Sequence, residues 1–281
     1  MLSAGTNMHP KGGSIMLFRA KEKHLTLDGV RMDYITFGSG SRPLVMIQGL
    51  NTRGVRGSSV PLAFMYRLFA KAYTVYLFDR RADVFEGMTI RDLAHDLARA
   101  MDALGIKEAD ILGVSQGGMI AQVLAIERPD LVRRLALAVT LCRTNDTARN
   151  VINGWIAMVS RGDMRALTAD MAEKMYSDAY LKRYRPLLPL LTILQRPKDV
   201  RRFVILARAC LTFDACGELD RIQCPVFVIG GRQDKVVGSD ACEDIAKRLG
   251  CKVHLYETLG HAAYEEAGDF NRRVYDFFME G

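Results

Sequence analysis

Short apolar runs alternate with segments of helical periodicity along most of the chain. Beyond residue 40 there are six such runs of four or five residues, at 44–47, 74–78, 110–114, 135–139, 226–230 and 253–256. Runs of this length suit strands that are covered on both faces. Helical spacing of apolar positions is found at about 58–71, 89–104, 116–127, 240–249 and 264–279. This alternation predicts an α/β fold with a doubly wound, mostly parallel central sheet.

Two antiparallel strands are predicted ahead of the parallel ones. The stretch HLTL is followed by Asp28-Gly29 and then by VRMDYITF, in which Val30, Met32 and Tyr34 fall on one face. Asp-Gly between two such stretches is a typical hairpin signal. With the hairpin added to the six apolar runs, the sheet is expected to have about eight strands.

One interval is too long for a simple connection between a strand and the next. More than eighty residues separate the runs 135–139 and 226–230, whereas ordinary α/β connections have about 2 to 6 residues. The interval has helical patterns, and Pro186 and Pro189 are expected to break its third helix. We predict four parts: a loose leader at 1–20, a first core part at 21–142, an inserted helical cap at 143–217, and a second core part at 218–281.

The composition is that of an ordinary soluble globular protein, with 49% hydrophobic and 25% charged residues and a net charge of +7. A membrane-spanning helix needs about 18 consecutive apolar residues, and no segment of the sequence comes near this length. The apolar run near the N-terminus is too short for the apolar region of a signal peptide. Basic residues are enriched in the middle of the sequence, but they do not form a continuous block interleaved with aromatic residues. We interpret them as a solvated face and expect neither a nucleic-acid nor a membrane partner. They are Lys182, Arg183, Arg185, Lys198, Arg201, Arg202 and Arg208.

The six cysteines form no CxxC pair and have no histidine at metal-ligand spacing. We interpret them as buried free thiols and expect no metal site. Together with the lack of a signal segment, this predicts a reduced, cytoplasmic protein. The cysteines are Cys142, Cys210, Cys216, Cys224, Cys242 and Cys251.

The hexapeptide GVSQGG at 113–118 contains a candidate nucleophile, Ser115. The pattern GxSxG occurs by chance in roughly one unrelated chain in ten of this length. Its position is more informative, because it follows a buried strand and opens a helix, which is the context of a nucleophile elbow. Gly113 and Gly117 remove side chains that would collide with neighbouring elements. A glycine-rich turn without chemistry is the alternative.

A serine nucleophile needs a base, and a histidine base needs an acceptor that fixes its tautomer. Of the five histidines, His261 alone stands in a loop directly after a strand, at the edge where ligands bind in open α/β sheets. Asp234, a few residues beyond 226–230, is the first candidate for the acid, with Asp146 and Asp214 as competitors. The chain order Ser, Asp, His is that of α/β hydrolases.

Acyl transfer also needs donors for the oxyanion. Two backbone amides are candidates: that of Gln116, which follows the serine, and that of Leu50, which follows the third predicted strand. Gly49 lets the main chain turn inward before Leu50.

Over about residues 30–281 the chain resembles the α/β-hydrolase superfamily, in particular its capped enol-lactonase and carboxylesterase-like branch. The resemblance is carried by MIQGLN, GVSQGGMIAQVLA with ERPDLVRRLAL, VFVIGGRQD and LGHAAYEE. It implies that Ser115, Asp234 and His261 are nucleophile, acid and base. The chain departs from the family at Gln48, where His is frequent, and at FDRRADVFEG, where DxRGxGxS is frequent.

The expected function is hydrolysis of a small carboxylic ester, thioester or lactone through an acyl-enzyme on Ser115, without a metal or organic cofactor. The same triad could cleave a carbon–carbon bond or transfer the acyl group to another acceptor, and a slow-turnover ligand receptor is the alternative from another class. The expected partner is a small-molecule substrate; the oligomeric state is left open, and a homodimer is compatible with the sequence.

Substrate contacts are expected from Asn51 and from the cap, where Trp155, Met158 and Met175 are candidates. At helical spacing these cap residues equally suit packing within the cap. Arginines of the cap would favour an anionic group of the substrate. Further cap candidates are Met171, Tyr176, Leu187, Leu190 and Leu191.

Overall fold

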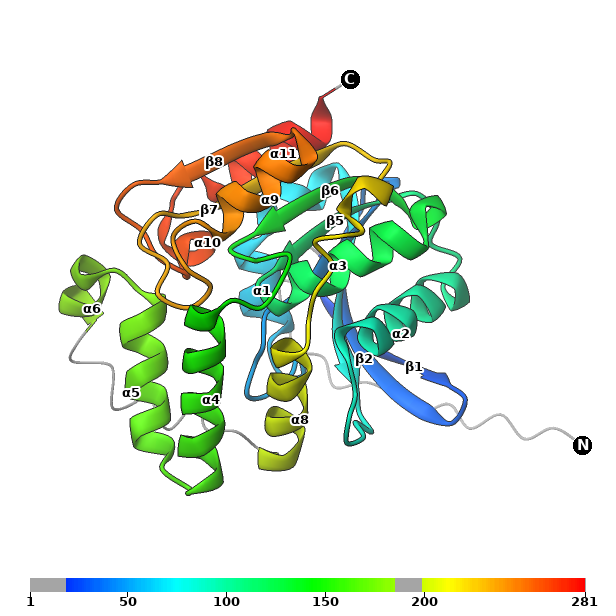
Figure 1. Cartoon of the computed structure of the whole chain (residues 1–281). Helices are drawn as coiled ribbons and strands as arrows, with labels where there is room; N and C mark the ends of the chain where they lie inside the picture. Colours follow the sequence, from blue (N-terminus) through cyan, green and yellow to red (C-terminus); the bar gives the residue numbers. More distant parts are fainter. Residues whose placement is uncertain (1–18, 185–198, 281) are drawn as a thin grey trace, which may run out of the picture.

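The computed structural model describes residues 19–184 and 199–280, and within them eight strands form one sheet in the order β1-β2-β4-β3-β5-β6-β7-β8 (Figure 1). The strands are β1 Lys21–Leu27, β2 Val30–Gly38, β3 Arg42–Ile47, β4 Tyr73–Arg81, β5 Ala109–Val114, β6 Val132–Ala138, β7 Val226–Gly231 and β8 Lys252–Tyr256. The pairs β1–β2 and β2–β4 are antiparallel, and all other pairs are parallel. The predicted fold class is confirmed.

Helices cover both faces of the sheet, as expected for a doubly wound fold. Along β3, Val45 and Ile47 point into one core while Leu44 and Met46 point into the other. The first core is closed by α2 Ile90–Ala103, α3 Gln116–Glu127 and α9 Ala241–Leu249. The second is closed by α1 Ser59–Met65, a 3-10 helix Arg67–Lys71, α10 Ala263–Glu266 and α11 Phe270–Met279.

Two predicted helices are each divided in the structure. The segment 58–71 forms α1 and then the tighter 3-10 helix, and the segment 264–279 forms α10 and α11. Gly268 and Asp269 lie at the second break, and both residues are poor in a helix interior, so the helix restarts after Asp269. Among the described residues, none of the helices combines the length and apolar character that a membrane span needs.

The interval between β6 and β7 is helical, as predicted. It contains α4 Asp146–Ser160, α5 Met164–Met175, α6 Asp178–Tyr184 and α8 Val200–Leu211. Figure 1 shows α4, α5 and α8 side by side and projecting away from the sheet, and α4 packs against both of the others. Pro186 and Pro189 lie outside the described residues, and the predicted boundaries of the four parts of the chain stay a prediction.

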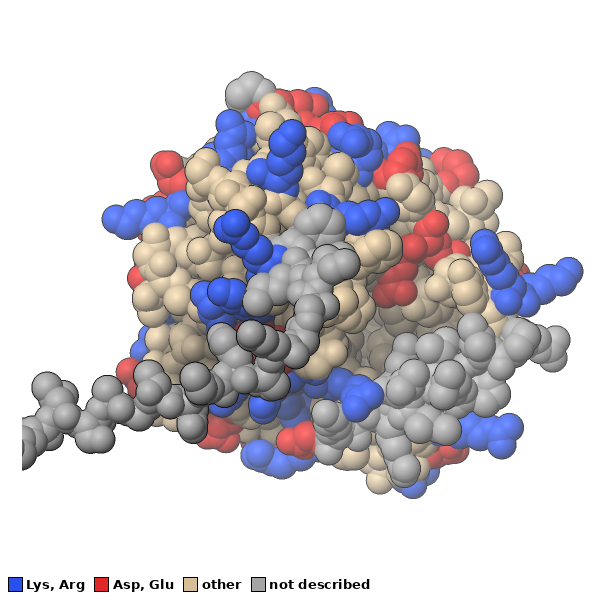
Figure 2. All heavy atoms as spheres, turned by 180° about the vertical axis from the view of Figure 1, so that it is seen from behind, with Lys and Arg blue, Asp and Glu red and all other residues tan. Residues whose placement is uncertain are grey.

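The basic residues of the cap are partly neutralised by acidic neighbours. Arg202 forms an ion pair with Asp79 at 3.1 Å, and Arg208 forms one with Glu86 at 3.3 Å. On the face shown in Figure 2, lysine and arginine side chains are spread among acidic ones and do not form one block. Arg185 and Lys198 lie outside the described residues. The expectation that nucleic acid is not a partner stays a prediction.

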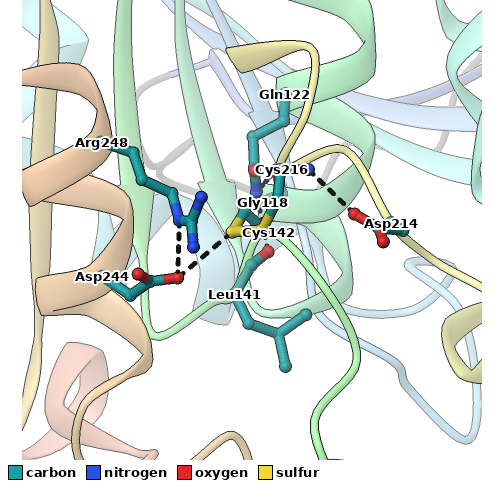
Figure 3. Close-up of a disulfide and its surroundings, with 8 residues drawn as sticks. All are labelled: Gly118, Gln122, Leu141, Cys142, Asp214, Cys216, Asp244 and Arg248. Carbon is teal, nitrogen blue, oxygen red and sulfur yellow. Dashed lines mark hydrogen bonds and ion pairs between the residues drawn. A yellow bond between two sulfur atoms is a disulfide. The ribbon is translucent and has the colours of Figure 1, made fainter.

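The chain enters and leaves the cap through two segments that pair with each other. Arg143 and Asp214 form an antiparallel bridge, and the amide of Ala215 donates to the carbonyl of Cys142 at 2.8 Å. This pairing brings Cys142 against Cys216, and the two form a disulfide across 74 residues of sequence (Figure 3). The interpretation of all six cysteines as free thiols is therefore wrong, because it relied on local spacing. The cysteines described as free are Cys210, Cys224, Cys242 and Cys251.

Loss of the disulfide is expected to lower the free energy of unfolding by about 2–4 kcal/mol, because the unfolded chain regains the entropy of a long open loop. The melting temperature with and without a thiol reductant measures this. Cys142→Ser should melt at the lower temperature and should not respond further to reductant, whereas Cys251→Ser should respond like the native protein. An unchanged melting temperature of the native protein in reductant would show that the bond does not stabilise it.

Candidate active site

The carboxyl ends of neighbouring parallel strands bring the predicted site residues to one edge of the sheet. Ile47 of β3 pairs with Gly113 of β5, so the chain reaches Gly49 and Ser115 at the same height, two positions beyond this pair. A Cβ atom at Gly49 would lie 3.2 Å from the Cβ of Ser115. The loop after β3 therefore runs directly beside the candidate nucleophile.

Ser115 occupies the sharp turn between β5 and α3, with φ 53° and ψ −119°. A positive φ is unusual for a residue with a side chain and persists only when the surroundings enforce it. Here the amide of Ser115 donates to the carbonyl of Ala138 at 2.9 Å, and the hydroxyl of Thr140 donates to the carbonyl of Ser115 at 2.8 Å. A Cβ at Gly117 would lie 2.0 Å from the carbonyl oxygen of Ile47. The turn thus requires glycine there, and the serine is left partly exposed.

The structure brings Ser115, His261 and Asp234 into one hydrogen-bonded series. The Nε2 atom of His261 lies 2.9 Å from the Oγ of Ser115, and its Nδ1 lies 2.8 Å from the Oδ2 of Asp234. The other carboxylate oxygen of Asp234 accepts the amides of Val236 and Val237 at 2.8 and 3.0 Å. His261 and Asp234 are both buried. The arrangement has the geometry of a nucleophile, its base and the group that orients the base.

The competing residues lie elsewhere. Asp146 is in the first turn of α4, and Asp214 is at the base of the cap. Within the described residues neither carboxylate is hydrogen-bonded to His261. His95 lies on α2 and His254 lies in β8, where neither can reach the serine turn. Of the candidates considered, the structure brings His261 and Asp234 to Ser115 and leaves Asp146 and Asp214 elsewhere.

Two backbone amides near Ser115 are available for an oxyanion. Gln116 is the first residue of α3, and Leu50 follows Gly49. Among the described residues no acceptor is hydrogen-bonded to either amide. The loop that contains Leu50 lines a cavity of about 200 Å³. The other lining residues are Gln48, Gly49, Asn51, Leu62, Met65, Tyr66, Val114, Tyr264 and Glu265.

Residues 42–268 match the sequence profile of the family described as the alpha/beta hydrolase fold. The chain belongs to this family.

Named relatives of this α/β hydrolase agree with the resemblance to the enol-lactonase-like branch. The chain is 25% identical over 262 residues to 3-oxoadipate enol-lactonase 2 of Acinetobacter baylyi, covering 89% of this chain and 94% of that protein. It is 26% identical over 256 residues to the dihydrolipoyllysine-residue acetyltransferase component of the acetoin cleaving system of Cupriavidus necator, covering 87% of this chain but only 66% of that protein. The crystal structure of the enol-lactonase from Burkholderia xenovorans LB400 shares the fold, with a TM-score of 0.81 at 22% identity over 92% of this chain and 100% of that one.

A buried arginine that the sequence interpretation missed lies behind the loop of this α/β hydrolase that contains Gly49 and Leu50. Arg80, at the end of β4, donates to the carbonyls of Gln48 and Gly49 and to the side-chain oxygen of Gln116, the last at 3.0 Å. The side-chain Nε2 of Gln116 in turn donates to the carbonyl of Leu206 in α8 at 2.7 Å. Burial lowers the pKa of Arg80 to about 10, so it remains charged at neutral pH. Its guanidinium therefore joins the loop that precedes Leu50 to the side chain of Gln116.

Arg80→Lys is expected to lower kcat for ester hydrolysis by about 10- to 100-fold, because the shorter lysine side chain cannot place its ammonium where Nη2 of Arg80 contacts Gln48, Gly49 and Gln116 and small displacements of catalytic groups are costly. KM should change little. Arg99→Lys, on the exposed side of α2, is the matched control and should keep kcat within about twofold. An Arg80→Lys protein with the native kcat would show that the guanidinium does not position the loop.

The cap candidates differ in their surroundings. Trp155 is buried and donates to Asp170 of α5 at 2.8 Å, which makes it part of the packing between α4 and α5. The carbonyl of Met175 accepts the amide of Ala262 at 2.8 Å, so the end of α5 contacts the loop that carries the histidine. Met158 is half-buried in the cap. Of these residues none borders the 200 Å³ cavity as far as the structure describes it, whereas Asn51 does. Leu187, Leu190 and Leu191 lie outside the described residues.

Proposed function

We propose that this chain is a serine-dependent hydrolase of a small carboxylic ester, thioester or lactone. The observation that carries the proposal is the series from Ser115 through His261 to Asp234, with hydrogen-bond lengths of 2.9 and 2.8 Å. A serine alone is a weak nucleophile, and this series supplies its base and the acceptor that fixes the tautomer of that base. The partly exposed Ser115 lies beside a cavity that can receive a substrate.

In the proposed mechanism the Oγ of Ser115 attacks the carbonyl carbon while Nε2 of His261 takes its proton. Asp234 accepts the Nδ1 proton of His261 and stabilises the imidazolium that forms. The amides of Leu50 and Gln116 donate to the tetrahedral oxyanion, where each donor is worth about 2.7–4 kcal/mol. His261 then protonates the leaving alcohol or thiol. In the second half of the reaction His261 takes a proton from a water molecule, the water attacks the acyl carbonyl, and the proton returns to Oγ of Ser115 as the acid is released.

The relatives support hydrolysis of this class without naming the substrate. One relative is named an enol-lactonase, and opening of a lactone is the same attack on an ester carbonyl. Another is named as the acetyltransferase component of a larger system, which makes acyl transfer to an acceptor other than water the second candidate. Both reactions pass through an acyl group on Ser115 and differ only in what removes it.

A panel of 4-nitrophenyl esters, thioesters and lactones tests the proposal. We expect turnover of at least one class, and an acyl adduct on Ser115 in the intact mass of a rapidly quenched reaction. Addition of alcohols and amines then distinguishes the two candidates, because a transferase diverts most of the acyl group to the added acceptor. Tight, saturable ligand binding without turnover of any class would contradict a hydrolase and favour a receptor.

A further inference from the structure

The cavity beside the candidate nucleophile contains a carboxylate that the proposed mechanism does not use. Glu265, in α10, lines the same cavity of about 200 Å³ as Gly49 and Leu50 of the oxyanion loop. It stands four positions after His261, and its side chain is accessible to solvent. Ser115 is not among the lining residues, but its neighbours Val114 and Gly49 are, so a substrate with its carbonyl at Ser115 can extend into this cavity.

Three tyrosines surround Glu265. The hydroxyl of Tyr176, at the end of α5, donates to its Oε2 at 2.6 Å, and Tyr264 is near enough to interact with the carboxylate. Tyr66 is near enough for its hydroxyl to interact electrostatically with Glu265, and Tyr66 and Tyr264 both line the cavity. A negative charge beside aromatic faces is the environment that binds an ammonium group. The hydrogen bond from Tyr176 also holds the carboxylate in place before any ligand arrives.

The negative charge of the Glu265 carboxylate has no protein counter-ion in the part of the chain that the structure describes. No lysine or arginine there interacts with Glu265, and the neighbouring Glu266 adds to the negative potential. The carboxylate of Glu266 is held by the amide and hydroxyl of Ser177 at 2.9 and 2.5 Å. Desolvation by the surrounding side chains raises the pKa of the Glu265 carboxyl. Because the Glu265 side chain is exposed and no described lysine or arginine neutralises it, the cationic group of a ligand can reach it.

Besides the polar side chains of Gln48 and Asn51, the lining of the cavity has an apolar part that would suit a short hydrocarbon chain. Leu62, Met65 and Val114 contribute to it. The cap arginines Arg202 and Arg208, which could have favoured an anionic substrate, are already paired with acidic side chains. Arg80 lies behind Gln48 and Gly49 and is hydrogen-bonded to their carbonyls, so among the described lining residues Glu265 supplies the charge that faces the cavity.

We infer that this cavity is a subsite for an ammonium group of the substrate, with Glu265 as its counter-ion and Tyr66 and Tyr264 as aromatic walls. The inference rests on the proposed function and narrows its substrate class to small esters that carry an amine a few bonds from the scissile carbonyl. Glu265 binds and selects the substrate and takes no part in bond cleavage.

Two isosteric esters test the subsite. Benzyl 3-aminopropanoate and benzyl butanoate differ by an ammonium in place of a methyl group, and benzyl hemisuccinate supplies an anionic comparison. The native protein should prefer the amine ester over the butanoate by about tenfold or more in kcat/KM, since a hydrogen bond to a charged group contributes about 1.5–3 kcal/mol. In Glu265→Gln the ratio should fall to about one. Glu257→Gln, on the exposed Arg232 pair, should keep the native ratio.

The outcome that overturns the inference is an equal rate for the two esters in the native protein, a preference for the hemisuccinate, or a ratio that Glu265→Gln leaves unchanged. Because each ratio is taken within one protein, a general loss of activity does not affect it. Binding of butylammonium, with 1-butanol as the neutral comparison, is measured by calorimetry in the native protein and in Glu265→Gln. This binding measurement tests the ammonium subsite even if no ester is hydrolysed. Absence of hydrolysis would then contradict the proposed function without affecting the result for the subsite.

Discussion

Ser115→Ala is expected to lower kcat for ester hydrolysis by up to about 10⁶-fold, the loss found when the nucleophile of a complete triad is removed. Without Oγ no acyl-enzyme can form, and the oxyanion amides retain only their share of the catalysis. The fold should persist, because the turn is held by backbone contacts of residue 115 to Ala138 and Thr140 that alanine keeps. The measurement is kcat on the best ester of the panel, together with the melting temperature.

Ser160→Ala is a suitable control for this experiment, because Ser160 is the exposed last residue of α4. Its kcat should equal that of the native protein. Retention of more than about a tenth of the native kcat in Ser115→Ala would contradict the nucleophile assignment, since no route that bypasses the serine reaches such rates.

Asp234→Asn is expected to reduce kcat by about 10⁴-fold with little change in stability. The carboxylate oxygen that accepts the amides of Val236 and Val237 must remain an acceptor, so the asparagine carbonyl will occupy that position. Its NH₂ group then faces Nδ1 of His261, which must become an acceptor. The proton moves to Nε2, and the histidine can no longer take the proton of Ser115.

The controls for Asp234→Asn are the other carboxylates considered. Asp146→Asn and Asp214→Asn should each leave kcat within about threefold of the native value, because neither side chain is hydrogen-bonded to the histidine in the described structure. A normal kcat in Asp234→Asn combined with a large loss in either of the other two would reassign the acid.

The fold was predictable because local signals and the periodicity of apolar residues agree. Each apolar run forms a strand, and Thr89 begins α2 with a capping box in which Asp92 returns a hydrogen bond. The grouping of Ser115 with His261 was also predictable, since parallel strands end at the same edge of the sheet and few polar residues follow them. These inferences need only the order of elements along the chain.

The features that sequence did not reveal depend on contacts between distant segments. Cys142 and Cys216 meet because the two ends of the cap pair, and their separation of 74 residues carries no sign of it. Arg80 carried one signal, a charged residue at the end of an apolar strand, but its acceptors lie on two other elements. The tyrosines near Glu265 likewise come from distant segments: Tyr66 follows α1, Tyr176 follows α5, and Tyr264 lies in α10. For Trp155, helical spacing could not separate packing against Asp170 from contact with a ligand.

Labelling with a small fluorophosphonate, followed by mapping of the modified peptide by mass spectrometry, tests the central claim most directly. The probe reacts with a serine whose hydroxyl is activated by a neighbouring base, whatever the natural substrate is. We predict a single phosphonyl adduct on Ser115 of the native protein and none there in a His261→Ala variant. A folded native protein that stays unlabelled at Ser115, or that is labelled at another serine, would contradict the account.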